Sequence, residues 1–328
     1  MNPLKPHIVL AGGSGFIGRH LARHLLQAGY AVTILSRSPA MKNDAREQPH
    51  LRWVCWDGRT LGPWAACLEN AAGLINLAGQ NVNCRYHARN RQAILNSRLD
   101  STRILGQACR QCSQPPKVWI QSSTLAIHSD RGDEVLTETS PIGTGFSPSV
   151  AKAWEDAAIE AAGPDIRQVI LRISFVLGRD GGALPMLAKL ARMGLGGSVG
   201  DGKQYYSWIH IDDLAGIILQ AILHPSMQGL YNATSPAPVR NTVFMKLVRQ
   251  TVGRGWSPPA PRWAIHLGCW LMRTEPELAL RSCYGLPARL AEAGFRFTYP
   301  TLEEALDNLY PSHAAARSGC LTTLYERL

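Results

Sequence analysis

No apolar run in the sequence approaches the roughly 20 residues that a membrane-spanning helix needs. The first residues, MNPLKPHIVLAGG, hold one short apolar run that leads directly into glycines, which is typical of a first strand and not of a signal peptide. With neither a span nor a targeting segment, we expect a cytoplasmic protein that has no membrane partner.

The sequence also lacks a second cysteine pair. Its eight cysteines are scattered, and the CxxC of Cys109 and Cys112 has no histidine cluster near it. A zinc site usually needs four ligands. We therefore expect ordinary thiols in a reducing compartment and no metal site.

The sequence has fewer acidic than basic residues: 24 Asp and Glu compared with 34 Lys and Arg, which gives a net charge of +10. The basic residues are dispersed and do not form the Lys/Arg stripe with interleaved aromatics that nucleic-acid binding requires. We expect no nucleic-acid partner. The excess charge fits either a soluble basic surface or attraction of an anionic ligand such as a nucleotide phosphate.

The pattern along the first half alternates short apolar strands with periodic helices, which predicts an α/β fold: a Rossmann-type doubly wound parallel sheet with a smaller C-terminal substrate domain. Predicted strands cover residues 7–11, 31–37, 51–57, 73–79, 117–123 and 167–178, and predicted helices cover 17–29, 91–112 and 149–163.

The character of the chain changes after residue 178, where glycine-rich and proline-punctuated segments begin. We expect residues 1–178 to form the dinucleotide-binding domain and residues 207–230 to return to it. Residues 179–206 and 231–310 then form the smaller substrate domain, and 311–328 a weakly ordered tail.

A glycine motif follows the first predicted strand and opens a helix: Gly12-x-x-Gly15-x-x-Gly18. The first glycine permits a tight turn, the second lets backbone N–H groups approach a pyrophosphate, and the third allows close helix–strand packing. In this context the motif predicts dinucleotide binding. The cofactor-binding residues predicted here are Gly12, Ser14, Gly15, Phe16, Ile17 and Gly18.

The end of the second strand selects between the two nicotinamide cofactors. An Asp or Glu there would bond the ribose 2′-hydroxyl of NAD. This sequence has Ser36 and Arg37 instead, which suit a 2′-phosphate and favour NADP over NAD. The alternative is that Arg37 is only a solvated loop cation.

Further motifs carry a family resemblance. In order along the chain they are GGSGFIG, INLAG, NSRL, LRISFVLGRDGGAL, GLGGSVGDGKQYYSWIHIDDLAG and LPARLAEAGFRFTYPTLEEAL. Together they resemble the epimerase-like branch of the extended short-chain dehydrogenase/reductases, NAD(P)-dependent epimerase/dehydratase-like proteins that have a C-terminal domain of unassigned function. The resemblance runs from about residue 7 to residue 310, nearly the whole chain.

The resemblance implies that NADP lies across the strand ends, and it places four residues near the cofactor. Leu77 and Ala78 should face it, Arg98 should reach its phosphates or ribose, and Val176 should lie near the nicotinamide. The alternatives are ordinary strand packing for Leu77 and Ala78 and an exposed helix arginine for Arg98.

One expected feature is missing. Related sugar-modifying enzymes use a Tyr as acid/base and a Lys four residues later, but FSPSVAKAWEDAA contains no tyrosine. If Glu155 sets the register, the Lys position is Ala151 and the Tyr position is Ser147. Lys152 is one residue out of register, or about 100° around a helix, so we expect it on the surface near a helix start.

Such sites also have a Ser or Thr that holds the substrate oxygen, and this sequence has candidates at the end of the fifth predicted strand. There Ser123 or Thr124 could hold a substrate oxygen, the alternative being a strand end satisfied by local backbone. Four residues are candidates to replace the tyrosine as proton donor: His128, His210, Tyr205 and Tyr206. The alternatives are that His128 is an ordinary loop residue and that His210 belongs to the domain interface; the sequence does not place Tyr205 and Tyr206. Asp212 and Asp213 are interpreted as helix N-terminal caps.

Three functions stay open. The first is an NADP(H)-dependent oxidoreductase that acts on a small carbonyl or hydroxyl substrate without the usual Tyr-x-x-x-Lys pair. The second is a non-catalytic NADP-binding sensor that signals through a partner. The third is a nucleotide-sugar epimerase, against which the missing pair argues. A homodimer stays open as the oligomeric state.

Overall fold

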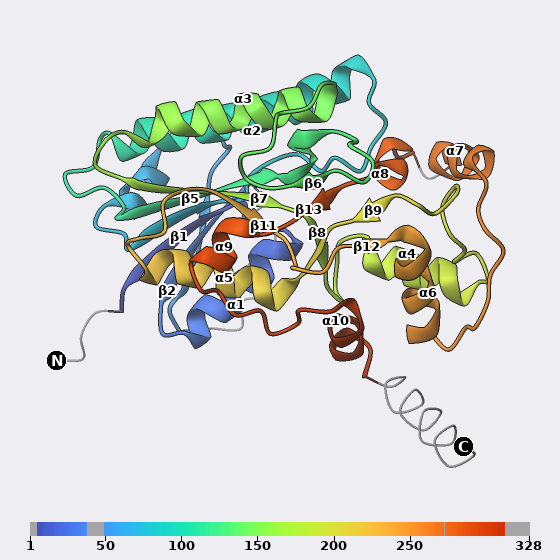
Figure 1. The fold of residues 1–328 in the computed structure, drawn as a ribbon. Helices are drawn as coiled ribbons and strands as arrows, with labels where there is room; N and C mark the ends of the chain where they lie inside the picture. The colour runs from blue at the N-terminus through green and yellow to red at the C-terminus, as the bar shows by residue number, and fades with distance from the viewer. Residues whose placement is uncertain (1–4, 38–48, 272, 312–328) are drawn as a thin grey trace, which may run out of the picture.

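A seven-stranded parallel sheet forms the centre of the molecule (Figure 1). The computed structural model describes residues 5–37, 49–271 and 273–311. The sheet has the order β11-β7-β5-β4-β1-β2-β3, which confirms the predicted doubly wound Rossmann-type fold. Its strands are β1 (His7–Ala11), β2 (Ala31–Ser36), β3 (Leu51–Cys55), β4 (Gly73–Asn76), β5 (Val118–Thr124), β7 (Arg167–Ile173) and β11 (Gly229–Ala233).

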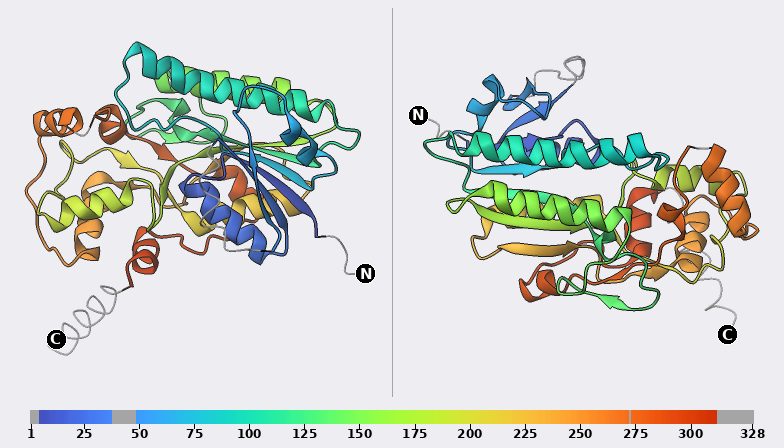
Figure 2. Two further views of the ribbon diagram at one scale, coloured as in Figure 1. Left: turned by 180° about the vertical axis from the view of Figure 1, so that it is seen from behind. Right: turned by 90° about the horizontal axis from the view of Figure 1, so that it is seen from above.

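Helices cover both faces of this sheet, which is why its central strands are almost uninterrupted apolar runs. On one face α2 (Ala88–Cys109) and α3 (Phe146–Ala162) run side by side (Figure 2). They approach closely because Gly106 has no side chain: a Cβ there would lie 2.5 Å from the Cβ of Ala161. The other face carries α1 (Phe16–Gln27), α5 (Ile211–Leu223) and the short α9 (Ala288–Glu292).

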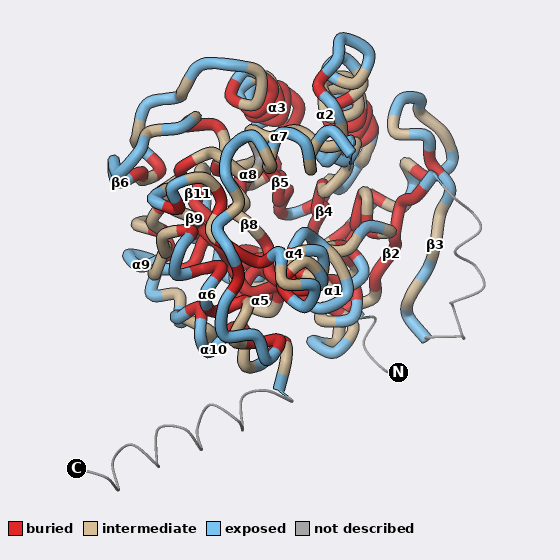
Figure 3. Tube along the Cα trace, turned by 90° about the vertical axis from the view of Figure 1, so that its right-hand side faces the viewer, coloured by how far each residue is buried: buried red, intermediate tan, exposed pale blue. Residues whose placement is uncertain are grey.

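A smaller core lies beyond the carboxyl ends of the strands. It packs α4 (Leu184–Arg192), α6 (Asn241–Thr251) and α10 (Leu302–Leu309) against β8 (Phe175–Leu177) and β10 (Trp208–His210). Buried residues concentrate in the two cores, and the outer helix α7 (Arg262–Leu271) has none (Figure 3). The remaining elements are η2 (Pro63–Leu68), η3 (Leu125–His128), β6 (Val135–Leu136), β9 (Tyr205–Tyr206), β12 (Val239–Arg240), α8 (Glu277–Leu280) and β13 (Tyr284–Gly285).

The prediction of one strand over residues 167–178 is wrong in one respect. The chain leaves the central sheet at Ser174, whose N–H and hydroxyl both donate to the carbonyl of Ala233. From Phe175 onward it pairs with β10 instead. The strand segments before and after Ser174 are both largely apolar. The hydrophobic pattern of the sequence therefore does not reveal the break between them.

The predicted domain limits stay a prediction. The central sheet includes β11, which ends at Ala233, a few residues beyond the predicted limit of 230. Of the predicted tail at 311–328, residues 312–328 lie outside the described residues. No helix within the described ranges has both the length and the apolar character to cross a bilayer.

Candidate functional site

The candidate site lies where the strand order reverses, between the carboxyl ends of β1 and β4. In doubly wound sheets the strand ends diverge at this point and leave a crevice for ligands. Gly12 follows β1 and has φ of 76°, a conformation that favours glycine. A Cβ on Gly12 would lie 2.8 Å from backbone atoms of Leu77 and Ala78. The glycine turn and the NLAG segment are therefore in backbone contact.

The other two glycines of the motif differ in their surroundings. A Cβ on Gly18 would lie 2.4 Å from the Cα of Gly13, so this glycine is required by helix–turn packing. A Cβ on Gly15 would meet only the Gly12 carbonyl oxygen, at 3.6 Å, and its φ is an ordinary −74°. The fold itself therefore tolerates a side chain at Gly15.

The amino terminus of α1 is open to a ligand. Its N-cap is Gly15, no side chain of the described residues caps the helix, and its first turn has no acidic residue. Free N–H groups and the helix dipole at such an end attract phosphate. Ser14 belongs to the same turn, and its carbonyl accepts a hydrogen bond from the Arg19 side chain at 3.2 Å.

Phe16, the first residue of α1, is embedded in a glycine-rich segment that comes from residues 178–182. A Cβ on Gly178 would lie 2.4 Å from the Phe16 ring, and a Cβ on Gly181 would lie 2.5 Å from it. Val176 is 9% exposed and pairs with Ile209 just before this segment. The segment that follows β8 therefore packs directly on the glycine turn, while the Ile17 side chain packs against the core.

Ser36 and Arg37 lie at the carboxyl end of β2, on the other side of the glycine turn. The Gly12 N–H donates to the carbonyl of Leu35 at 3.1 Å, which holds the two segments together. Ser36 is buried and Arg37 is exposed. Both residues lie at the strand end that the sequence predicts to meet the cofactor ribose, and their contact with a cofactor stays a prediction.

Buried polar groups hold the β4 end rigid. Asn76 is fully buried; its amide donates to Thr102 and Gln121, and its Oδ1 accepts from the Ala78 N–H at 3.0 Å. These bonds direct the backbone of Leu77 and Ala78 toward the glycine turn.

Arg98 of α2 lies against Gly79, directly behind this segment. Its guanidinium donates to the carbonyls of Gln80 and Ile94, and it stacks 4.9 Å over the Trp154 ring. Burial lowers the pKa of Arg98 to about 10, and it remains a cation at neutral pH. In this structure Arg98 supports the loop after β4.

A buried ion pair lies below the end of β5. Glu155 of α3 and Arg172 of β7 form a two-pronged pair with N–O distances of 2.9 and 2.8 Å. Their side chains are 7% and 4% exposed. The Ser123 hydroxyl donates to Glu155 Oε1 at 2.6 Å. Ser123 is therefore committed to a buried carboxylate and joins β5 to α3 and β7.

Thr124 is the last residue of β5 and is only half-buried. Its Oγ1 accepts a hydrogen bond from the Ala126 N–H at 3.2 Å. Within the described part of the chain its hydroxyl proton has no acceptor. Of the two predicted residues, Thr124 is the one whose hydroxyl can donate to a ligand.

The positions of the missing acid/base pair lie in the first turns of α3. Ser147, at the predicted tyrosine position, donates to Glu277 at 3.4 Å, and Ala151, at the predicted lysine position, is fully buried. Lys152 is 56% exposed and pairs with Asp156 at 2.5 Å, which confirms its predicted surface position. No side chain of this helix restores the pair.

A tyrosine from another segment, Tyr86, reaches the start of α3. Its ring packs edge-on against Phe146 with 5.0 Å between centroids, in a small apolar cluster with Ile94 and Val150. Burial raises its pKa. Tyr86 is 9% exposed and is therefore packed as a core residue.

The other proposed proton donors are engaged in structure. His128 is fully buried, its Nδ1 donates to the Pro141 carbonyl at 2.9 Å, and burial lowers its pKa. The Tyr206 hydroxyl donates to Ala279 at 2.6 Å, and burial raises its pKa to about 12. Tyr205 stacks on Tyr284 with 4.3 Å between ring centroids.

The SWIHIDD segment joins α5 to its neighbours. The interpretation of Asp212 and Asp213 as caps is wrong, because the cap of α5 is His210, whose Nδ1 accepts the Asp212 N–H at 3.1 Å. Asp212 instead pairs with His20 of α1 at 2.7 Å. Asp213 accepts the N–H groups of residues 298 and 299, and so anchors the GFRFTYP segment.

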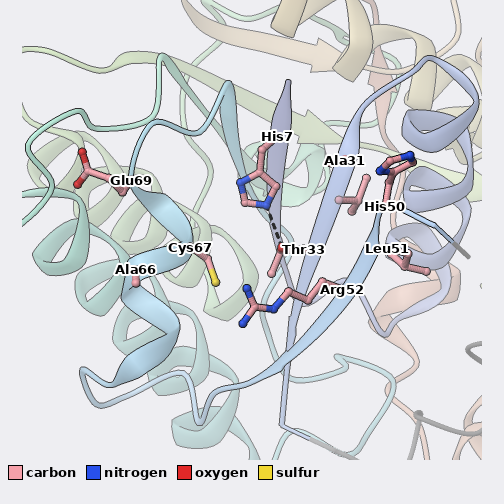
Figure 4. Close-up of a pocket in the computed structure, with 10 residues that line it drawn as sticks. His7, Ala31, Thr33, His50, Leu51, Arg52, Ala66, Cys67 and Glu69 are labelled. Carbon is pink, nitrogen blue, oxygen red and sulfur yellow. Dashed lines mark hydrogen bonds between the residues drawn. The ribbon is translucent and has the colours of Figure 1, made fainter. Parts of the chain in front are cut away.

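A cavity of about 450 Å³ lies at the opposite edge of the sheet, by the amino ends of β1, β2 and β3 (Figure 4). Across it His7 and Thr33 form a hydrogen bond of 2.8 Å. The carboxyl ends of the strands are remote from it, so it is separate from the candidate site. It is lined by His7, Ala31, Val32, Thr33, His50, Leu51, Arg52, Ala66, Cys67 and Glu69.

A glycine turn at the switch point of a parallel sheet defines a dinucleotide-binding protein of the Rossmann type. Comparison with known families agrees: the chain belongs to the NAD-dependent epimerase/dehydratase family, whose model matches residues 8–233. Residues 260–309 match a domain of unknown function, DUF1731. The resemblance to epimerase-like short-chain dehydrogenase/reductases is thereby confirmed.

Relatives match almost the whole chain. Epimerase family protein SDR39U1 of Bos taurus is 33% identical over 304 residues, covering 91% of this chain and 98% of the relative. Epimerase family protein YfhF of Bacillus subtilis is 33% identical over 309 residues, covering 92% and 97%.

Among solved structures, human SDR39U1 (isoform 2) with NADPH superposes with a TM-score of 0.82 at 30% identity, covering 93% of this chain and 99% of that one. A nucleoside-diphosphate sugar epimerase from Corynebacterium glutamicum gives a TM-score of 0.74 at 29% identity, covering 93% of this chain and 58% of that one.

Removal of the buried Glu155 carboxylate should destabilise the protein strongly. Glu155→Ala leaves Arg172 buried without its partner, and we expect the free energy of unfolding to fall by about 3–5 kcal/mol. Denaturant unfolding measures the change. The double variant Glu155→Leu/Arg172→Met, which removes both charges, should lose less than the single variant. Equal or larger loss in the double variant would contradict a desolvated pair.

The stability contributed by His210 should depend on pH. Burial lowers its pKa to about 4 from an ordinary value of 6.5, so the neutral ring is the folded form. Above pH 6.5 the ring is neutral in both the folded and the unfolded chain, so its contribution to folding stability is complete. Between pH 6.5 and 4 the unfolded chain binds the proton and the folded chain does not, so this stability is lost as the pH falls. The loss reaches about 3 kcal/mol at most.

His210→Asn keeps a side-chain acceptor at the N-cap but does not titrate. The stability difference between wild type and this variant should be constant above pH 7 and shift against the wild type between pH 6.5 and 4. Parallel stability curves over that interval would show that His210 does not titrate as its burial requires.

Proposed function

We propose that this protein binds NADPH in the crevice between β1 and β4 and transfers its hydride to a small carbonyl substrate. The observation that carries the cofactor half is the open, uncapped amino terminus of α1 beside Ser36 and Arg37. The human relative SDR39U1, solved with NADPH and similar over 93% of this chain, supports the same cofactor. NAD is the less favoured cofactor because no acidic side chain ends β2.

The proposed cofactor contacts divide by part of the dinucleotide. The turn from Gly12 to Gly18, including Ser14, Gly15, Phe16 and Ile17, would hold the pyrophosphate through backbone N–H groups. Ser36 and Arg37 would hold the 2′-phosphate. Leu77, Ala78, Arg98 and Val176 would border the ribose and nicotinamide, with Arg98 acting through the loop that it supports.

The proposed chemistry depends on Thr124. When bound, NADPH supplies the hydride. The Thr124 hydroxyl would donate to the substrate carbonyl and polarise it, while Ser123, bound to Glu155, keeps the strand end in place. The described residues offer no side chain in the usual acid position, so an ordered water is the proposed proton source.

A second candidate is a non-catalytic NADPH sensor. It is favoured by a specific observation: the positions of the acid/base pair hold Ser147 and Ala151, and Ala151 is fully buried. A nucleotide-sugar epimerase, the activity named for the Corynebacterium glutamicum neighbour, ranks lower because it must remove and return a hydroxyl proton. NADPH oxidation measured against a panel of carbonyl compounds separates the reductase from the other two, because an epimerase returns its hydride, and mass spectrometry of co-purified ligand identifies a bound nucleotide sugar.

Arg37→Ala should weaken NADPH binding by about ten- to a hundredfold and leave NADH binding nearly unchanged, because a charge-assisted contact to phosphate contributes about 1.5–3 kcal/mol. Calorimetric titration with both cofactors measures the ratio. An unchanged NADPH/NADH ratio would remove Arg37 from the site.

Gly15→Val, titrated in the same way, tests whether either cofactor binds at the glycine turn. The fold accommodates a side chain at Gly15, so the variant should stay folded while losing both cofactors. Full affinity in folded Gly15→Val would overturn the whole dinucleotide site.

Thr124→Val should lower turnover tenfold or more, because a lost hydrogen bond to a reacting oxygen costs about 1–3 kcal/mol. Thr124→Ser keeps the hydroxyl and should retain most of the activity.

Lys152→Ala should change turnover less than about twofold. Ser123→Ala should act mainly through stability. A large loss in Lys152→Ala at normal NADPH affinity would show that the lysine position has been misplaced.

A further inference from the structure

Helix α7 (Arg262–Leu271) presents its large apolar side chains to solvent. Trp263 is 71% exposed, Leu267 58%, Trp270 64% and Leu271 75%. Their spacing of four, seven and eight residues places them on one face of the helix. Trp256, in the loop before α7, is 75% exposed as well. We call these five residues the α7 face; folded monomers rarely leave such residues uncovered.

The opposite side of this helix is less exposed. Ala264, Ile265 and Cys269 are half-buried. At the carboxyl end of α7, the Arg85 guanidinium donates to the Trp270 carbonyl at 2.5 Å and lies 5.5 Å from the ring centroid. The large apolar residues of the α7 face are the more exposed side of the helix.

The segment that contains α7 is basic, and Glu275, which accepts the Tyr86 N–H, follows directly after it. Residues 214–274 contain no Asp or Glu. The stretch holds six basic residues: Arg240, Lys246, Arg249, Arg254, Arg262 and Arg273. Three of these, Arg254, Arg262 and Arg273, are exposed in or beside the α7 face, and Arg85 adds a fourth exposed cation. Residues 214–274 thus have a net charge of +6, out of +10 for the whole chain.

This charge selects the occupant. A second copy of the chain would bring a second set of exposed arginines to a symmetric contact, where Glu275 is already bonded to the Tyr86 N–H of its own chain. An acidic protein would need a groove for a helix that protrudes at the outer end of the molecule (Figures 1 and 2). An anionic bilayer surface needs no groove. Tryptophan partitions to the headgroup region, and arginine is attracted to anionic lipid.

We propose that the α7 face docks on the surface of an anionic phospholipid bilayer, with α7 lying in the plane of the interface. The prediction of no membrane partner rested on the absence of a spanning segment, and a helix that lies on a bilayer needs no span. The proposal is independent of NADPH binding and of turnover.

The test is co-sedimentation of the full chain with vesicles of phosphatidylglycerol and phosphatidylcholine mixed in equal parts, and with vesicles of phosphatidylcholine alone. We expect binding to the mixed vesicles that weakens with salt, and at least tenfold weaker binding to phosphatidylcholine. Trp263→Ala/Trp270→Ala should weaken binding at least tenfold. Arg262→Ala and Arg273→Ala should each weaken it about fivefold.

The matched control replaces apolar residues of similar exposure on other helices, Ile159→Ala/Leu223→Ala, at 60% and 57% exposed. Thermal unfolding verifies that every variant is folded. The control should bind like the wild type. Equal binding to both vesicle types, equal loss in the control, or no binding at all would overturn the proposal. So would a dimer in sedimentation velocity that the tryptophan variant abolishes, because a second copy would then be the occupant.

Discussion

The site depends on one close approach between backbones. Gly12 meets the Leu77–Ala78 segment with no room for a Cβ, and the same glycine bonds to Leu35 of β2. Three strand ends are therefore held around one residue in a left-handed conformation. Because β1 is the pivot of the strand order, this contact determines where the crevice opens and which backbone N–H groups line it.

Below the strand ends lies a layer of buried polar groups that serves the same purpose. Asn76 and its partners hold the end of β4, and the Ser123–Glu155–Arg172 group holds the ends of β5 and β7. Such groups are costly to bury singly and stabilising only when all are satisfied. Together they replace flexible strand ends by a rigid floor, which is what a precisely positioned cofactor requires.

Much of this was predictable from the sequence, for identifiable reasons. Strand β1 and the glycine turn follow from local pattern, because a turn with positive φ needs glycine wherever the rest of the chain goes. The break at Ser174 was not predictable, since it depends on the carbonyl of Ala233, far along the chain. The role of Ser123 was missed likewise: a serine at a strand end looks like a ligand contact until Glu155 is placed beside it. The capping histidine was missed because acidic residues are the commoner caps.

The embedding of Phe16 in residues 178–182 has a consequence for engineering of the chain. The first residue of the first helix and the segment that leads out of the central sheet share one interlocking surface, in which Gly178 and Gly181 have no space for a larger residue. In this chain the two halves therefore fit together only while this aromatic residue and these glycines are all present. A chimera that replaces one half of this chain should keep the aromatic residue and its glycines together, because a larger residue at either glycine would clash with the Phe16 ring.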